Sequence, residues 1–249
     1  MKTSGNTIFI SGGTAGIGFA MAKLFSKDNK VIITGRDETR LEKALAQLPG
    51  VAGIRSDIAD NDQAVSLSQK LSKEFPQLNI VINNAGRAAV HNLSETGKAY
   101  QIAKDEMDTN FLAVVRFNDL ILPLLKKQTT AAIVNVSSVV AFAAAASLPT
   151  YAASKSALHA YSQVLRHSIS ATSVKVFELM PPLVNTEFSK EIGGENGIAP
   201  ELVAQHLADS LASDNFEIHS GDTAGIYQLF LGDPQRAFLA MNQTREVVA

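Results

Sequence analysis

Tyr151 and Lys155 are four residues apart, a spacing that places both side chains on one face of a helix. An ammonium group beside a phenol favours the phenolate and lowers a pKa that starts near ~10. Such a tyrosine can donate a proton to a carbonyl oxygen or remove one from an alcohol. Because the same spacing is common on surface helices, the pair alone leaves a purely structural role open.

Ser138 precedes Tyr151 by thirteen residues and follows the apolar run Ala132–Ser137. Its hydroxyl could hydrogen-bond the substrate oxygen on which Tyr151 acts. Apolar strands often end in a serine, so the case for Ser138 depends on its combination with Tyr151 and Lys155.

A glycine-rich segment, Ser11–Gly18, follows the first apolar run and precedes a helical pattern. Gly12 permits a tight turn, while Gly16 and Gly18 let backbone approach a phosphate and pack helix on strand. The N–H groups at the helix start would then bind a pyrophosphate. The spacing is not G-x-G-x-x-G and lacks the Lys-Ser/Thr of a P-loop, so a turn without a ligand stays open.

The second apolar run ends in Thr34, Gly35 and Arg36. An NAD site usually has an acid near this point for the ribose 2′-hydroxyl. Gly35 has no carboxylate to repel a phosphate and Arg36 offers a cation, so this sequence favours NADP. A solvated Arg36, or one stacked on adenine, would leave NAD acceptable.

The composition excludes several classes of protein. The 249 residues carry 22 Lys and Arg against 24 Asp and Glu, and the longest basic run is Lys126-Lys127, which argues against nucleic acid or an anionic membrane as partner. Without cysteine there are no disulfides or thiolates, and the five histidines lack metal-ligand spacing. No signal-peptide core or 18-residue apolar stretch is present, so we expect a cytoplasmic protein that binds neither metal nor membrane.

Short apolar runs alternate with longer helical patterns, which predicts βαβ units and a parallel sheet covered on both faces. The predicted strands are Thr7–Ser11, Val31–Thr34, Val51–Ser56, Ile80–Asn83, Ala132–Ser137, Val174–Met180 and, more weakly, Phe216–His219. The predicted helices are Gly16–Lys27, Glu38–Leu48, Asn61–Glu74, Gln101–Lys127 and Tyr151–Ala171, with a further helical run after Thr223 through Met241. No linker divides the chain, so we predict one α/β domain over residues 1–249.

Two polar, glycine-bearing segments follow strand ends and are predicted lids, Arg87–Gly97 and Val184–Pro200. The apolar stretch Val139–Leu148 either packs in the core or lines a roomy substrate pocket, and both interpretations stay open. The pocket predicted on the second interpretation consists of Ser138, Val140, Phe142, Leu183, Phe188 and Ile192.

Several motifs together resemble the compact short-chain dehydrogenase/reductase family: Ser11-Gly12-x-x-x-Gly16-Ile17-Gly18, Asn83-Asn84-Ala85-Gly86, Asn110, Ser138 and Tyr151-x-x-x-Lys155. They occur in the family's order, from the first strand to about Thr186. Leu165-Arg166-His167 and Pro181-Pro182 also resemble a bacterial oxidoreductase branch associated with lipoteichoic-acid D-alanylation genes. The resemblance implies a Rossmann-type doubly wound sheet of about seven parallel strands, with a nicotinamide cofactor across its carboxyl edge.

The resemblance also implies roles for individual residues. Tyr151 would be the acid/base, Lys155 would hold the nicotinamide ribose, Ser138 would orient the carbonyl, and Asn110 would anchor a water that links Lys155 to solvent. The implied cofactor contacts are Gly12, Thr14, Gly16, Ile17, Gly18, Arg36, Asp57, Ile58, Asn84, Ala85, Gly86, Tyr151, Lys155, Pro181, Val184 and Thr186.

We therefore expect an NADP(H)-dependent carbonyl reductase or alcohol dehydrogenase, with NAD(H) possible, that acts on a mainly apolar ketone, aldehyde or secondary alcohol. The alternative is a nucleotide-binding sensor or scaffold with incidental activity, although such proteins often lose a catalytic residue and this chain keeps all four. A methyltransferase also uses a glycine-rich turn, but it has no use for Tyr151 and Lys155.

Two departures from the family pattern affect the expected assembly and the turn before the second lid. Pro181-Pro182 replaces the usual Pro-Gly, and the glycine-rich tail strand is missing. We expect a homodimer through Gln101–Lys127 and Tyr151–Ala171, or a homotetramer, although docking through the tail is in doubt.

Overall fold

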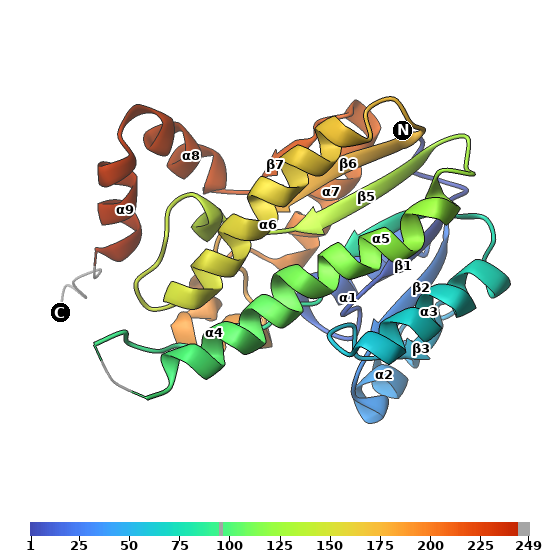
Figure 1. Ribbon diagram of the computed structural model, residues 1–249, viewed down its shortest axis with the longest axis horizontal. Helices are drawn as coiled ribbons and strands as arrows, with labels where there is room; N and C mark the ends of the chain where they lie inside the picture. The colour runs from blue at the N-terminus through green and yellow to red at the C-terminus, as the bar shows by residue number, and fades with distance from the viewer. Residues whose placement is uncertain (95–96, 244–249) are drawn as a thin grey trace.

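The computed structural model describes residues 1–94 and 97–243 and contains one sheet of seven parallel strands (Figure 1). The strands are β1 (Thr7–Ile10), β2 (Lys30–Gly35), β3 (Ala52–Arg55), β4 (Leu78–Asn83), β5 (Ala131–Val136), β6 (Val174–Met180) and β7 (Glu217–His219). Their spatial order is β3-β2-β1-β4-β5-β6-β7. The strands β2 and β3 are added on one side of β1, and β4 to β7 are added on its other side. This is the doubly wound arrangement, which confirms the predicted fold class and opens a crevice at the carboxyl edge.

Helices cover both faces of the sheet (Figure 1). The helices are α1 (Gly16–Phe25), α2 (Glu38–Leu45), α3 (Asn61–Glu74), α4 (Ala99–Met107), α5 (Ala113–Leu125), α6 (Pro149–Ser168), α7 (Pro200–Ser213), α8 (Thr223–Gly232) and α9 (Pro234–Asn242). On β1, Ile8 and Ile10 pack in the core on one side of the sheet and Phe9 packs in the core on the other. Burial on both faces explains why the strands are continuously apolar.

The helix predicted over Gln101–Lys127 is interrupted. A π-helical turn, Asp108–Leu112, lies between α4 and α5 and contains the fully buried Asn110. The Asn110 amide accepts from Arg87 N at 2.8 Å and donates to Arg87 O at 2.8 Å and to Ser154 Oγ at 2.9 Å. Apolar periodicity could not show the turn, because contacts with distant residues stabilise it. Such turns are frequent at functional sites.

The C-terminal third also differs from the prediction. The sequence analysis missed α7, although Pro200 at its first turn and the buried Val203 and Leu207 are typical of a helix start and a buried face. The run predicted through Met241 is two helices, because Asp233 accepts from Arg236 N at 3.0 Å and Pro234 cannot continue α8. Among the described residues, no helix is long and apolar enough to cross a membrane.

A buried network of amides fixes the carboxyl ends of β4 and β5. Asn83 donates to Asn118 Oδ1 at 2.8 Å and to Asn135 Oδ1 at 2.9 Å, and Asn135 donates to Ser162 Oγ at 2.9 Å. These hydrogen bonds join β4 and β5 to α5 and α6. They also offset the free-energy cost of burying polar amide groups. The two strands that carry the loops of the site are therefore held rigidly beside the helix that carries Tyr151 and Lys155.

Candidate active site

The structure brings Ser138 and Tyr151 together at the carboxyl edge of the sheet. Ser138 follows β5, and its Oγ accepts from Val140 N at 3.3 Å at the start of a short 3₁₀ turn. Tyr151 lies in the first turn of α6, which starts at Pro149, and is 9% exposed. Burial raises the pKa of Tyr151 well above its usual range, and a hydrogen bond with Ser138 acts in the opposite direction. Burial therefore favours the protonated phenol.

Lys155 lies one helical turn further along α6. Its Nζ lies 5.6 Å from the Tyr151 ring centroid and donates to Val136 O at 2.8 Å. Burial lowers the pKa of Lys155 to about 8, and the charge of Glu178 acts to raise it. A Cβ on Gly86 would lie 3.4 Å from Asn110 Oδ1 and 3.8 Å from Lys155 Nζ, so the four residues predicted as catalytic converge on one site.

The glycine-rich segment forms a cradle of bare backbone above β1. Gly12 and Gly16 have positive φ angles of 66° and 54°, and a Cβ on Gly18 would lie 2.2 Å from Gly12 O. The Asn84 amide donates to Gly12 O at 3.0 Å and so joins the cradle to the loop after β4. The N-cap of α1, Ala15, makes no side-chain cap bond. The arrangement fits the pyrophosphate of a dinucleotide, which would occupy the space and accept from the N–H groups of α1.

The end of the crevice at β2 and β3 carries two arginines. Arg36 is exposed, and its carbonyl accepts from Arg55 Nε at 3.3 Å. The sequence analysis missed Arg55, although the pairing of neighbouring strand ends could have found it, because Arg55 lies opposite Gly35 in the β2–β3 register. A Cβ on Gly35 would lie 2.5 Å from Thr14 Cγ2, so Thr14 lies against the end of β2. Arg55 Nε also lies 3.5 Å from Glu38 Oε2, at the start of α2.

The predicted adenine contacts lie in the turn after β3. The Asp57 carboxylate accepts from Ala59 N at 3.0 Å, and Ile58 O accepts from Arg116 at 2.8 Å. These bonds fix the turn in place, whereas contact with adenine stays a prediction.

The segment Val184–Pro200, the predicted second lid, lies over Tyr151. The Phe188 ring centroid is 6.1 Å from that of Tyr151, and Ile192 packs against the cluster that contains Tyr151 and Val140. A Cβ on Gly16 would lie 3.2 Å from Thr186 Cγ2, so this segment also contacts the glycine cradle. In the first predicted lid, Arg87–Gly97, residues 95 and 96 lie outside the described residues.

Pro181, a predicted cofactor contact, has its carbonyl oxygen 3.5 Å from Ser138 Oγ. The two remaining predicted pocket residues, Leu183 and Phe142, lie in different places. Leu183 O accepts from Ile198 N at 3.0 Å within the second lid. Phe142 contacts α8, with its ring centroid 5.1 Å from that of Tyr227. The sequence analysis missed Ile226 on α8 and Met241 on α9, which both pack against the Tyr151 cluster. Their contacts depend on how the C-terminal helices fold back, and no local motif carries that information.

A dinucleotide cradle beside a Ser-Tyr-Lys arrangement defines the class of nicotinamide-dependent oxidoreductases. The chain belongs to the short-chain dehydrogenase family, whose profile matches residues 6–197. It is 38% identical over 248 residues to the uncharacterized oxidoreductase DltE of Bacillus subtilis, a match that covers 97% of this chain and 98% of the relative. The family and the branch expected from the sequence are thereby confirmed, and the protein is an NAD(P)-dependent dehydrogenase or reductase.

Solved structures agree with this fold. A short-chain dehydrogenase from Burkholderia cenocepacia in complex with NADP has a TM-score of 0.87 at 22% identity, covering 98% of this chain and 100% of that one. A relative from Burkholderia phymatum in complex with NAD also has a TM-score of 0.87, at 21% identity and full coverage of both chains. The two neighbours bind different cofactors, and their likeness to this chain shows its fold.

Proposed function

We propose that the protein is an NADP(H)-dependent carbonyl reductase or alcohol dehydrogenase that acts on a mainly apolar ketone, aldehyde or secondary alcohol. The observation that carries this proposal is the convergence of Ser138, Tyr151 and Lys155 beside the glycine cradle. The bound nicotinamide supplies a hydride acceptor or donor at its C4 atom.

The chain's own groups position the substrate and move the proton. The Ser138 hydroxyl donates to the carbonyl oxygen and orients it toward the Tyr151 phenol, which is within hydrogen-bond reach of Ser138. Tyr151 protonates that oxygen as negative charge develops on it, and the Lys155 ammonium stabilises the charge on Tyr151. In the oxidation of an alcohol the same groups act in reverse, with Tyr151 as the base.

The apolar surroundings of Tyr151 support the proposed substrate class. Val140, the lid residues Phe188 and Ile192, and Met241 come from three separate segments and lie around the Tyr151 ring. Burial of apolar surface against such side chains contributes roughly 25 cal/mol per Å², so an apolar substrate gains affinity that a charged one does not.

The first test is NADPH and NADH consumption, side by side, with a panel of aromatic and aliphatic ketones. Turnover that prefers NADPH supports the proposal, and turnover that prefers NADH supports the mechanism but overturns the cofactor assignment. Tight nucleotide binding without turnover of any substrate would contradict the reductase proposal and favour the sensor alternative.

Replacing Arg36 by alanine is expected to raise the KM for NADPH by roughly tenfold or more and to leave that for NADH nearly unchanged. The reason is that a charge-assisted hydrogen bond to a phosphate contributes ~1.5–3 kcal/mol. Steady-state kinetics with both cofactors measure this, with Lys43→Ala on the exposed end of α2 as the control. Equal changes for the two cofactors would mean that Arg36 does not select a phosphate.

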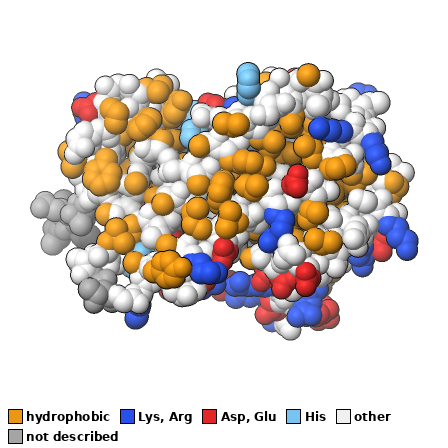
Figure 2. All heavy atoms as spheres, viewed as in Figure 1, with side chains coloured by type: hydrophobic (Ala, Val, Ile, Leu, Met, Phe, Trp, Pro, Cys, Tyr) orange, Lys and Arg blue, Asp and Glu red, His pale blue; other side chains and the backbone are white. Residues whose placement is uncertain are grey.

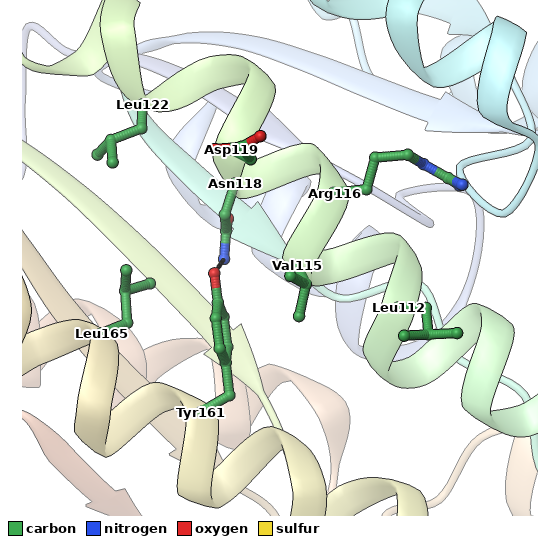
Figure 3. Close-up of a pocket in the computed structure, with 8 residues that line it drawn as sticks. All are labelled: Leu112, Val115, Arg116, Asn118, Asp119, Leu122, Tyr161 and Leu165. Carbon is green, nitrogen blue, oxygen red and sulfur yellow. Dashed lines mark hydrogen bonds between the residues drawn. The ribbon is translucent and has the colours of Figure 1, made fainter.

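We also propose that two copies of the chain pair through α5 and α6. Hydrophobic side chains gather on the face that these helices form, and a groove of about 510 Å³ runs between them (Figures 2 and 3). Leu112 lines this groove and is 49% exposed, and Val164, three residues after the groove residue Tyr161 on α6, is 64% exposed. The helix α5 carries only one arginine and one aspartate in its 13 residues. A two-fold axis through this face would cover the groove of each copy with the same helices of the other.

The expected cytoplasmic location stays a prediction.

Val164→Glu is expected to convert a dimer into a monomer, because it places a charge in the centre of an apolar contact. Light scattering after size exclusion measures the mass. Leu202→Glu on α7, a residue 44% exposed on the opposite side of the sheet, is the matched control and should leave the mass unchanged. A monomeric wild type, or a variant that stays dimeric, would show that this face is not the interface.

A further inference from the structure

A buried carboxylate lies behind the catalytic residues, in the middle of β6. Glu178 is 0% exposed, and its Oε1 accepts a hydrogen bond from Ser137 Oγ. Its Oε2 lies 2.9 Å from Nδ1 of His159 on α6. A charge buried inside a sheet is costly unless it is paired, and here His159 and Ser137 are the partners of Glu178.

The contacts of Glu178 are with direct neighbours of the site residues. Ser137, which donates to Glu178, lies between Val136, whose carbonyl accepts from Lys155, and the catalytic Ser138. His159 follows Lys155 by one turn on the same face of α6. The Glu178 carboxylate and the Lys155 ammonium are therefore held by neighbouring residues of β5 and by neighbouring turns of α6.

The charged groups around Glu178 change the pKa values of different residues. Among the described residues, Glu178 is the charge that raises the pKa of Lys155, against the lowering effect of burial. Glu106 raises the pKa of Tyr151 from the side of α4. The hydrogen bond that His159 donates to Glu178 raises the pKa of His159, Glu217 adds to that effect and Arg166 opposes it. His219, the remaining titratable group nearby, faces His159 from β7.

We propose that Glu178, held by Ser137 and His159, is the counter-charge that keeps Lys155 protonated, and is therefore a positioning residue for the reaction. Without it, the ammonium would lie in a buried site with only a neutral carbonyl as partner, and it would lose its proton closer to neutral pH. Tyr151 would then lose the positive charge that stabilises its phenolate. This inference rests on the proposed reductase function and adds a residue to it that touches neither substrate nor cofactor.

The test is the pH profile of kcat for Glu178→Gln, a neutral side chain of nearly the same shape. An opposite charge at short range shifts a pKa by about one unit or more, so the alkaline limb is expected to move down by ~1 pH unit. At pH values above this limb, kcat of the variant should be roughly tenfold lower than kcat of the wild type. At acidic pH, the two kcat values should be similar. Glu217→Gln is the matched control, because Glu217 lies opposite Glu178 in the β6–β7 register yet acts on histidines rather than on Lys155.

A folded Glu178→Gln enzyme whose alkaline limb coincides with that of the wild type overturns the proposal, as does an equal shift in Glu217→Gln. If Glu178→Gln does not fold, the double variant Glu178→Met with His159→Leu carries the same prediction, because apolar replacements of buried ion pairs are often tolerated. A wild type that turns over no carbonyl substrate at any pH would instead be a failure of the proposed function. The two failures are therefore distinguishable.

Discussion

Replacing Tyr151 by phenylalanine is expected to lower kcat by about 10³-fold or more and to leave NADPH affinity within about threefold. The change removes one oxygen atom, the only proton donor in the proposed reaction, and positioned general acids contribute about 10²–10⁴-fold to rates. The ring itself stays packed among Val140, Leu148 and Ala152. Because the fold and cradle are untouched, the loss should appear in kcat rather than in cofactor binding, as measured by steady-state kinetics and by NADPH fluorescence titration.

The control for this prediction is Tyr100→Phe, which removes the same oxygen from a side chain that is 82% exposed on α4. It should keep the activity of the wild type. Near-normal turnover by Tyr151→Phe would show that another group protonates the substrate, and the proposed acid would be wrong. A loss of NADPH binding together with kcat would point instead to a structural role for the phenol.

A part of the site could be predicted from the sequence when the residues that form it lie close together in the chain. The cradle and the Tyr151–Lys155 pair are sequence-local, since a strand–turn–helix and one helical turn suffice to arrange them. It was also predictable that the cradle and the Tyr151–Lys155 pair lie near each other, because the carboxyl ends of parallel strands meet at one edge of the sheet. The π-helical turn at Asn110 was not predictable from spacing, because Arg87 and Ser154, both distant in sequence, hold it.

The residues that the sequence analysis missed share one physical cause. Arg55, Met241 and Glu178 each contact a neighbour supplied by tertiary folding: the end of β2, the Tyr151 cluster and His159 in the middle of α6. In a strand as apolar as Val174–Met180, a single glutamate contradicts the burial pattern. Local patterns fail most often at functional positions, so such a contradiction is itself a signal of function.

Replacing Gly18 by alanine is expected to weaken NADPH binding by at least about tenfold and to lower the free energy of unfolding by about 1–3 kcal/mol, as overpacking of a tight contact does. The added Cβ would lie 2.2 Å from Gly12 O and 2.5 Å from Asn84 Nδ2. Neither atom can withdraw freely, because Gly12 O accepts the amide of Asn84 at 3.0 Å and the turn around it is held by Ser11. The methyl group must therefore push α1 away from the cradle, and the N–H groups at its start would move away from the pyrophosphate.

NADPH fluorescence titration and thermal unfolding measure the two effects separately. Gly225→Ala on α8 is the matched control, since a Cβ there meets nothing within 4 Å and alanine favours helix over glycine by ~1 kcal/mol. It should bind NADPH as the wild type does and unfold at the same or a slightly higher temperature. If Gly18→Ala instead bound NADPH within threefold of the wild type, the dinucleotide could not depend on the close approach of α1 to the end of β1, and the cradle would have to be assigned elsewhere.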